Sequence, residues 1–323
     1  MANTVSIFSI GFLRSYIITM RPYLLFISGI TGLAGMSFAA EISNIEAVVL
    51  FLAFFLSYGF GQALTDCFQT DTDSISSPYR PLVKGLINRN DVLIVSLAGL
   101  VICSIVFIYF SLINLLFTIL AVIGLATYTY FKRKWWSGPF YNAWIVAVLF
   151  FIGYISGLKN NSIYISNSIA AAMLAVFFGY ANFVLTGYFK DVNADRQTGY
   201  NTLLVKFGFR ISSIVSHLLA LLFILSAGVF IYFSVNFQSL IELIFAALFF
   251  IAGLITTILA QKKLSKVKDE TAAYKAISLV VHSYILILSA ITVLNKPTWL
   301  LLLIVFYLGF QSAMKSRPVQ NQI

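Results

Sequence analysis

Acidic residues are concentrated in two short segments of a chain that otherwise has few of them. The first segment reads TDCFQTDTDSISSPYRPLVKG from Thr65, and the second reads FKDVNADRQTGYNTLLVKFG from Phe189. Together they hold five of the eleven acidic residues: Asp66, Asp71, Asp73, Asp191 and Asp195. Carboxylate oxygens suit Mg²⁺, which in proteins usually completes its shell with water and substrate phosphates. The five aspartates are therefore candidate ligands of Mg²⁺ bound to a diphosphate, and all except Asp71 are also candidate catalytic residues.

The two acidic segments resemble each other in spacing. Leu82 lies nine residues after Asp73, Leu204 lies nine residues after Asp195, and each leucine begins a Leu-Val-Lys triplet. The segments align at an offset of 122 residues, with three extra residues between the outer aspartates of the first copy. We interpret this as a weak internal duplication, which predicts that the two segments meet around one cavity.

Helical periodicity indicates which carboxylates point the same way. Asp191 and Asp195 are one helical turn apart and share a face. Asp66 and Asp73 are two turns apart and share a face if the helix continues through them. Asp71 is then expected to point elsewhere.

Basic side chains near the two segments supply the positive charge that a diphosphate needs. The candidates at the same membrane face are Arg21, Arg80, Lys132, Arg133 and Lys190. Such groups bind phosphate oxygens through charge-assisted hydrogen bonds and stabilise a departing diphosphate. Ionisation of an allylic diphosphate leaves a carbocation, which aromatic faces stabilise. Tyr128 and Tyr130, beside Lys132, are the candidates for that role.

The elements that carry these residues are predicted to be membrane helices. The chain is 60% hydrophobic and 10% charged, with a mean hydropathy of +0.93, whereas soluble domains have roughly 25% charged residues. Apolar runs near the ~20 residues that span a bilayer lie at about 22–40, 46–64, 92–110, 112–131, 140–158, 166–187, 211–234, 238–260, 275–294 and 298–314. The predicted fold is an all-α bundle of nine core transmembrane helices plus a short tenth, with a central cavity open to the cytoplasmic side.

The distribution of lysine and arginine predicts the orientation of the bundle. With both termini and the loops that carry the acidic segments in the cytoplasm, only Lys159 and Lys296 of the 21 basic residues fall outside. This agrees with the positive-inside rule. The basic residues are spread over six segments rather than one stripe, so the net charge of +10 indicates contact with the lipid bilayer and no nucleic-acid partner.

The chain is predicted to be a single transmembrane domain over residues 1–323. Each acidic segment follows the second helix of a four-helix unit, which divides the domain into quasi-repeat halves of about 15–139 and 140–275. Residues 276–323 then form the C-terminal helices.

These motifs together resemble the UbiA-type superfamily of intramembrane prenyltransferases, and the resemblance covers most of the chain. It includes Arg21-Pro22, the aspartate-rich segment ending in SSPYRPLVKG, the run YTYFKRK from Tyr128, and KDVNADRQTGYNTLLVKFG from Lys190. By this resemblance, Arg80 corresponds to the arginine of the Arg-Pro pair that follows the first motif, and Lys132 with Arg133 to the basic pair of the family. It also implies that the aspartates of both motifs bind Mg²⁺ and the diphosphate.

Two features depart from the family pattern. The family usually has asparagine four residues before the first aspartate, where this chain has Gln62, an amide on a longer arm that we keep as a diphosphate-binding candidate. The aspartates of the first motif are usually four residues apart, whereas here Asp71 and Asp73 lie five and seven residues after Asp66. Counting back from Arg80 permits either as the second ligand, and the internal repeat favours Asp73.

The resemblance implies a Mg²⁺-dependent transfer of a prenyl group from a polyprenyl diphosphate to a lipophilic acceptor. The family's acceptors include hydroxybenzoates, naphthoates and glycerol phosphate lipids, and its frequent use of aromatic acceptors favours an aromatic or quinone-precursor substrate. The alternatives are a membrane terpene cyclase that acts on the same donor, and a membrane transporter or lipid-binding protein without enzymatic activity. A transporter would place its charges near the middle of the bilayer, whereas here they lie at the interface.

Overall fold

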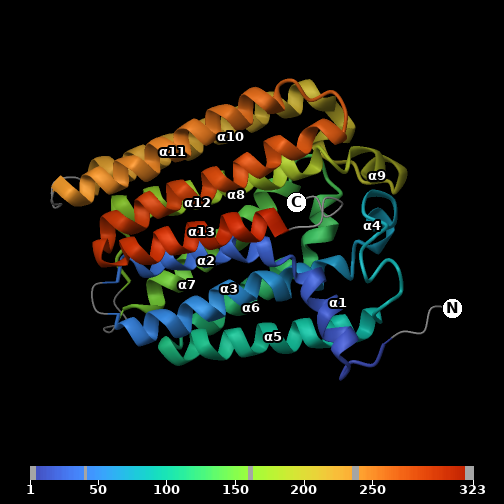
Figure 1. Ribbon diagram of the computed structural model, residues 1–323, viewed down its shortest axis with the longest axis horizontal. Coiled ribbons are helices and arrows are strands. Elements are labelled where there is room, and N and C mark those ends of the chain that lie inside the picture. Colours follow the sequence, from blue (N-terminus) through green and yellow to red (C-terminus); the bar gives the residue numbers. More distant parts are fainter. Residues whose placement is uncertain (1–4, 40–41, 159–162, 235–239, 317–323) are drawn as a thin grey trace.

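The computed structural model describes residues 5–39, 42–158, 163–234 and 240–316, and nearly all of these are helical (Figure 1). Most of the longer helices run side by side, and α1 lies across them at one end of the bundle. Their bounds are α1 Ile10–Met20, α2 Leu25–Met36, α3 Asn44–Asp66, α5 Arg89–Phe110, α6 Asn114–Lys132, α7 Gly138–Ser156, α8 Asn167–Tyr188, α10 Leu203–Ser234, α11 Leu240–Leu264, α12 Tyr274–Asn295 and α13 Leu300–Ser316. Two short helices, α4 Thr70–Ser76 and α9 Val192–Gln197, lie outside the bundle at one end.

The described residues contain nine helices that are long and apolar enough to cross a membrane, and ten if the bent pair of α1 and α2 counts as one span. This confirms an integral, multi-pass membrane protein. The predicted helices agree with the observed ones except at the start. There, a 3₁₀ turn at Pro22–Leu24 precedes a short α2, and the unpredicted α1 is inclined at 41° to it. Proline lacks the N–H that a continuous helix would need.

Local sequence signals explain where several spans begin. The Ser43 hydroxyl accepts a hydrogen bond from the Glu46 N–H, and the Glu46 carboxylate accepts one from the Ser43 N–H, so the two residues form a capping box at the start of α3. Asn88 caps α5 and Ser166 caps α8 through their side-chain oxygens. Helix ends inside or beside a membrane need such partners because an unpaired backbone group there is costly.

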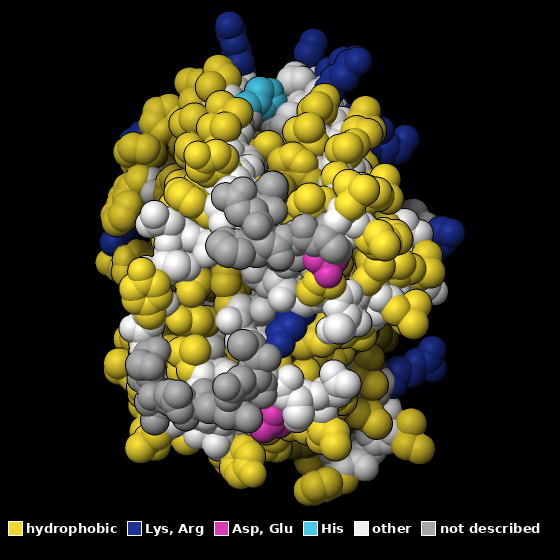
Figure 2. All heavy atoms as spheres, turned by 90° about the vertical axis from the view of Figure 1, so that its left-hand side faces the viewer, with side chains coloured by type: hydrophobic (Ala, Val, Ile, Leu, Met, Phe, Trp, Pro, Cys, Tyr) yellow, Lys and Arg dark blue, Asp and Glu magenta, His cyan; other side chains and the backbone are white. Residues whose placement is uncertain are grey.

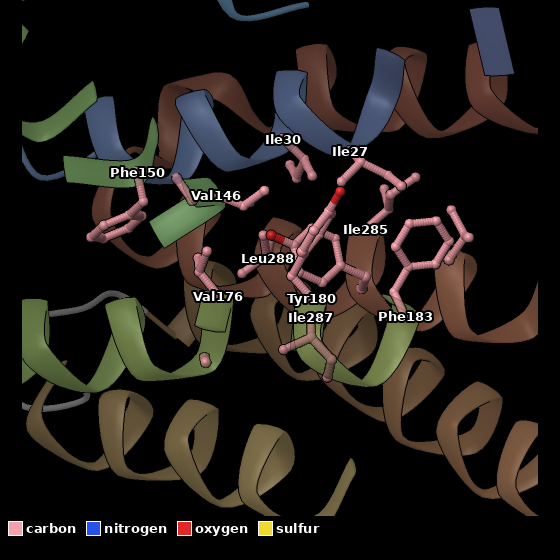
Figure 3. Packing of buried hydrophobic residues seen from close by; sticks show 14 of the residues in the cluster. Ile27, Ile30, Val146, Phe150, Val176, Tyr180, Phe183, Ile285, Ile287 and Leu288 are labelled. Carbon is pink, nitrogen blue, oxygen red and sulfur yellow. The ribbon is translucent and has the colours of Figure 1, made fainter. Parts of the chain in front are cut away.

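The core of the bundle lies among α2, α7, α8 and α12 (Figure 3). Ile30 of α2, Phe150 of α7, Val176 of α8 and Leu288 of α12 are all fully buried in it. Branched and aromatic side chains of this kind fill the space between helices at high density. This core fixes the relative positions of α3 and α8, which end at the acidic segments.

Glycine permits the close approach of α2 and α7. A Cβ atom on Gly35 would lie 2.1 Å from the backbone oxygen of Phe150, which cannot move without shifting α7. We expect Gly35→Ala to destabilise the protein by at least ~1–3 kcal/mol, the usual cost of overpacking a core. Thermal unfolding in detergent measures this. Gly228→Ala in α10, where a Cβ has open space, is the control and should leave the midpoint unchanged or raise it.

The end of the bundle that carries α4 and α9 gathers both acidic segments. The two short helices contact each other, and the hydroxyls of Thr72 and Thr198 lie 3.1 Å apart in a hydrogen bond. Segments more than a hundred residues apart in the sequence are therefore neighbours (Figure 1). The opposite end, shown in Figure 2, carries few charged side chains. Lys159 and both chain ends lie outside the described residues.

One expectation about the first segment is wrong. Asp66 and Asp73 do not lie on one continuous helix, because α3 ends at Asp66 and α4 begins only at Thr70. The chain turns between them at Cys67–Gln69, where backbone N–H groups bond to carbonyls three residues earlier. The turn brings α4 back over the end of α3.

Candidate active site

A large cavity opens beneath the two acidic segments. It encloses about 1300 Å³ of empty space, counted to its open mouth. Side chains of α3, α5, α6, α7 and α8 form its walls. Its inner part is mostly apolar and is lined by residues such as Leu100, Phe107, Val122, Leu149 and Ile152. The charged residues at its mouth are Arg21, Asp66, Asp73, Arg80, Lys132, Lys190 and Asp191.

Asp66 is the most heavily contacted carboxylate at this mouth, and it is almost fully buried at the end of α3. Nη2 of Arg21 donates to both of its oxygens at 2.8 Å. Nε2 of Gln62, one turn earlier in α3, donates to Oδ1 at 2.8 Å. The amide expected four residues before the aspartate is therefore present and in contact with it.

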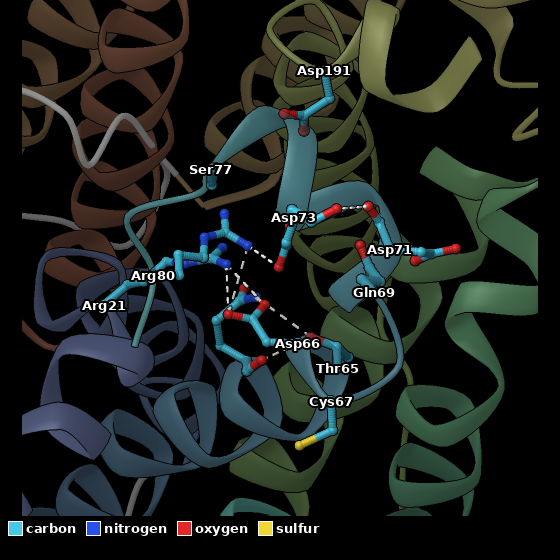
Figure 4. Close-up of polar contacts among 12 residues, drawn as sticks. Arg21, Thr65, Asp66, Cys67, Gln69, Asp71, Asp73, Ser77, Arg80 and Asp191 are labelled. Atoms are coloured by element: carbon cyan, nitrogen blue, oxygen red, sulfur yellow. Dashed lines mark hydrogen bonds and ion pairs between the residues drawn. The ribbon is translucent and has the colours of Figure 1, made fainter. Parts of the chain in front are cut away.

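Asp73 is the second buried carboxylate of the first segment, and it pairs with Arg80 from the loop after α4. Nη1 of the same guanidinium lies 3.7 Å from Oδ2 of Asp66. Figure 4 shows both arginines between the two carboxylates, with Asp191 on the far side of Asp73. One arginine thus links two aspartates that come from different helices.

The second acidic segment contributes two carboxylates with different surroundings. Asp191 lines the cavity mouth, and its Oδ1 lies 4.0 Å from Nζ of the adjacent Lys190. Asp195 is completely buried behind the mouth, with Oδ1 3.5 Å from Nζ of Lys132. That lysine also donates to Oε1 of Gln69 at 3.2 Å, so it joins both segments. Although Asp191 and Asp195 are one turn apart, only Asp191 lines the cavity.

The buried charges at the mouth perturb one another's protonation. Burial raises the pKa of Asp73, although Arg80 beside it opposes the shift. Burial raises the pKa of Asp195 to about 6, against the pull of Lys132. Burial also lowers the pKa of Lys190 to about 8. Clusters of buried charges with shifted pKa values are characteristic of functional sites.

Four residues predicted for the site lie outside the cavity: Asp195, described above, and Asp71, Arg133 and Tyr130. The Asp71 carboxylate is about half exposed, points away from the arginines in Figure 4, and lies 3.4 Å from Nη2 of Arg133. The Arg133 side chain is itself half exposed and covers the ring of Tyr200. Tyr130 is 61% exposed, with its hydroxyl 3.1 Å from Nζ of Lys134. Successive residues at the end of α6 point in different directions, so Tyr128 and Lys132 face inward while Tyr130 and Arg133 face outward.

The sequence analysis missed several polar and aromatic residues that line the cavity. Tyr58, Tyr180 and Tyr188 join Tyr128 in its wall. The hydroxyls of Tyr128 and Tyr188 lie 2.9 Å apart, and Nζ of Lys132 lies 5.5 Å from the centre of the Tyr188 ring. The position of Tyr188, three residues before Asp191, indicates that its side chain lies near the second acidic segment, so it could have been predicted from the sequence. Tyr58 and Tyr180 carry no comparable signal because they lie deep within apolar runs.

The donor set at the mouth suits Mg²⁺ chemically. Asp66, Asp73 and Asp191 supply only carboxylate oxygens, the ligands that this ion prefers. The described residues contain no group of three acidic, histidine or cysteine side chains close enough to form a protein cage. Mg²⁺ is typically held by one or two carboxylates and completed by substrate phosphates and water, so the residues fit Mg²⁺ bound together with a phosphate compound.

The arrangement therefore has a polar end for an anion and an apolar end for a hydrocarbon. Four cationic side chains face the cavity beside three carboxylates, and an apolar wall with four tyrosines lies below them. A phosphorylated head would bind at the charged mouth. A hydrocarbon tail would fill the apolar inner part and exclude water from it.

Comparisons with known proteins point to one family. Residues 28–280 match the sequence model of the UbiA prenyltransferase family. Among curated proteins, the digeranylgeranylglyceryl phosphate synthase of Thermococcus sibiricus is 30% identical over 208 residues, which cover 62% of this chain and 71% of that protein.

Two solved structures share the fold. A UbiA homologue from Archaeoglobus fulgidus bound to DMAPP and Mg²⁺ is 18% identical, with a TM-score of 0.63, and the match covers 84% of this chain and 99% of that one. The apo structure of a UbiA homologue from Aeropyrum pernix is 14% identical, with a TM-score of 0.67, and the match covers 80% and 94%.

Proposed function

The chain belongs to the UbiA prenyltransferase family, and from this premise we propose that it transfers a prenyl group from a polyprenyl diphosphate to the hydroxyl of a glycerol phosphate lipid. The observation that carries the proposal is the cavity with a charged mouth and an apolar interior. A prenyl diphosphate matches this cavity, because it has a highly charged head and a hydrocarbon tail. The family membership also favours an enzyme over the transporter considered from the sequence.

The cavity mouth is the proposed diphosphate site. Arg21, Arg80, Lys132 and Lys190 line it and would donate charge-assisted hydrogen bonds to the phosphate oxygens. Asp66, Asp73 and Asp191 are the side chains that would hold Mg²⁺, which when bound neutralises charge on the departing diphosphate. The prenyl tail would then extend into the apolar part of the cavity.

The chain's own residues would promote ionisation of the donor in two ways. The basic side chains stabilise the negative charge that grows on the diphosphate as the allylic C–O bond breaks. The faces of Tyr58, Tyr128, Tyr180 and Tyr188 border the cavity below them and would stabilise the positive charge on the prenyl carbon. The acceptor oxygen then forms the new C–O bond and releases its proton.

A phosphorylated acceptor is supported by the relatives and by charge. The Thermococcus sibiricus relative is named for a glycerol phosphate lipid, which replaces the aromatic acceptor that family frequency alone favoured. The cavity mouth is also rich in cations: four basic side chains face three carboxylates there. Four cations against three carboxylates leave an excess of one positive charge, to which bound Mg²⁺ would add, so the mouth favours anionic substrates.

The cavity mouth is proposed to face the cytoplasm. The loops at that end carry most of the lysine and arginine residues, and the positive-inside rule places such loops in the cytoplasm.

A substrate comparison tests the proposed reaction. Purified protein in detergent with Mg²⁺ and geranylgeranyl diphosphate is expected to prenylate a prenylglyceryl phosphate at least about 100-fold faster than 4-hydroxybenzoate, because a site that holds a phosphate leaves its cations unpaired when that phosphate is missing. Mass spectrometry detects a product heavier by the prenyl group. Prenylation of the aromatic acid alone would contradict the lipid acceptor. A cyclic product from the donor alone would support the cyclase instead.

A further inference from the structure

Asp66 and Asp73 at the cavity mouth already have cationic partners in this structure. Both oxygens of Asp66 accept from Arg21, and Oδ1 also accepts from Gln62. Asp73 pairs with Arg80, which also lies 3.7 Å from Asp66. Because both carboxylates are buried, these contacts take place where water screens charge weakly and ion pairs are strong. A divalent ion that uses the same oxygens competes with the arginines for them.

The backbone of Arg21 is held in an unusual conformation that directs this contact. Its φ and ψ are 54° and 72°, and it is the only residue other than glycine with a positive φ among those described. It lies at the junction where α1 ends and Pro22 begins the next turn. Side chains larger than glycine rarely adopt this conformation, and such strain is concentrated at functional sites. Capping a helix end does not require a cation, whereas the ion pair with Asp66 does.

We propose that Arg21 and Arg80 are exchange residues, which change partners when a diphosphate binds. Without a diphosphate they pair with Asp66 and Asp73. When they move to the phosphate oxygens, the freed carboxylates can bind the divalent ion. The inference rests on the proposed function, because it assumes a diphosphate and Mg²⁺ at this mouth. The arginines bind whichever anion is present, and each change of partner conserves the number of charge-assisted hydrogen bonds. Only the pairing between groups changes.

The proposed exchange makes the divalent ion and the diphosphate mutually dependent. Without a diphosphate, the ion competes with a guanidinium for Asp66 and binds weakly. With a diphosphate, Arg21 and Arg80 have another partner, and the ion meets free carboxylates. Such coupling is reciprocal, so each ligand raises the affinity of the other by the same factor. The metal site is thereby completed only when the donor is bound.

Replacement of Arg21 separates the exchange from simple diphosphate binding. Arg21→Gly removes the guanidinium and suits the positive φ, since glycine adopts that conformation without strain. In the full chain in detergent, with Mn²⁺ alone as the probe and paramagnetic resonance as the readout, we expect the variant to bind Mn²⁺ about ten- to a hundredfold more tightly than the unmodified protein. That range is the worth of a hydrogen bond to a charged group. Inorganic pyrophosphate without metal should bind at least about tenfold more weakly.

Two further variants control the experiment. Arg14→Ala removes one positive charge from an exposed position on the same helix and should change neither affinity more than about twofold. Arg21→Lys keeps the charge but loses the guanidinium plane, and should raise the Mn²⁺ affinity a few-fold. The lysine variant tests the proposal even if the glycine variant does not fold, which thermal unfolding would reveal.

The outcomes distinguish the exchange from the proposed function. Unchanged or weaker Mn²⁺ binding in both Arg21 variants, with weaker pyrophosphate binding, would overturn the exchange and leave Arg21 as an ordinary diphosphate ligand. Failure of the unmodified protein to bind Mn²⁺ and pyrophosphate even together would count against the proposed function itself. Tighter Mn²⁺ binding with weaker pyrophosphate binding supports the exchange.

Discussion

Replacement of Asp66 by asparagine is expected to lower kcat for prenyl transfer by about a thousandfold. Asparagine keeps the size of the side chain but removes a charge that contacts Arg21, Arg80 and Gln62 at once. It also removes a proposed ligand of Mg²⁺. Losing one group that stabilises developing charge costs about 10²–10³ in rate, and here the positions of two arginines change as well.

The rate of prenyl transfer at saturating donor and acceptor measures this effect in the purified variant. Because Asp66→Asn leaves Arg21 without its carboxylate and Arg80 with Asp73 alone, thermal unfolding must first show that the variant is folded. Asn90→Ala is a control on an exposed residue near the start of α5, away from the cavity mouth, and should keep at least half of the activity. Activity of the folded Asp66 variant within tenfold of the unmodified protein would refute the assigned role.

The second large effect is a difference between Asp73 and Asp71. Asp73 lines the cavity mouth and pairs with Arg80, whereas Asp71 is half exposed and faces Arg133. We expect Asp73→Asn to lower the rate by about a hundredfold or more. Asp71→Asn should lower it by no more than a few-fold, because exposed ion pairs contribute little.

The two asparagine variants act as matched controls for each other, since they lie two residues apart on the same short helix. Initial rates over a range of Mg²⁺ concentrations separate a metal role from a structural one. The Asp73 variant should need more Mg²⁺ to reach half of its own maximal rate, and the Asp71 variant should not. The reverse order of effects would make Asp71 the second ligand of the first motif.

Much of the fold and of the site could be predicted from the sequence, because both depend on strong local signals. Apolar runs long enough to cross a bilayer predicted the helices, and the family resemblance is confirmed by the match over residues 28–280. The spacing of the two segments predicted that they would meet around one cavity, and Asp66 and Asp73 of the first segment line the same cavity as Asp191 of the second. The roles of these residues stay predictions.

The features that could not be predicted depend on three-dimensional packing. The break between α3 and α4 places Asp73 over the cavity, yet the sequence allowed a continuous helix there. Tyr58 and Tyr180 line the cavity but lie in apolar runs, where an aromatic residue facing a cavity has the same pattern as one facing lipid. The closeness of Tyr130 to Lys132 in the sequence predicted a side chain that faces the cavity. Two residues along a helix correspond to a rotation of about 200°, so Tyr130 and Lys132 face different sides.

Helix α12 lies deep in the bundle and separates the outer helix α11 from α8, which is one wall of the cavity. The spanning segment Thr271–Asn295 is 83% buried, whereas Leu240–Leu264 is 22% buried. Helix α12 packs between α11 on one side and α2 and α8 on the other. The 25 residues of α11 extend over roughly 38 Å, more than the ~30 Å hydrocarbon layer, so this helix adapts by tilting. Since α11 faces lipid and α12 does not, α11 can tilt in a thinner or thicker membrane while α12 keeps its place against α2 and α8.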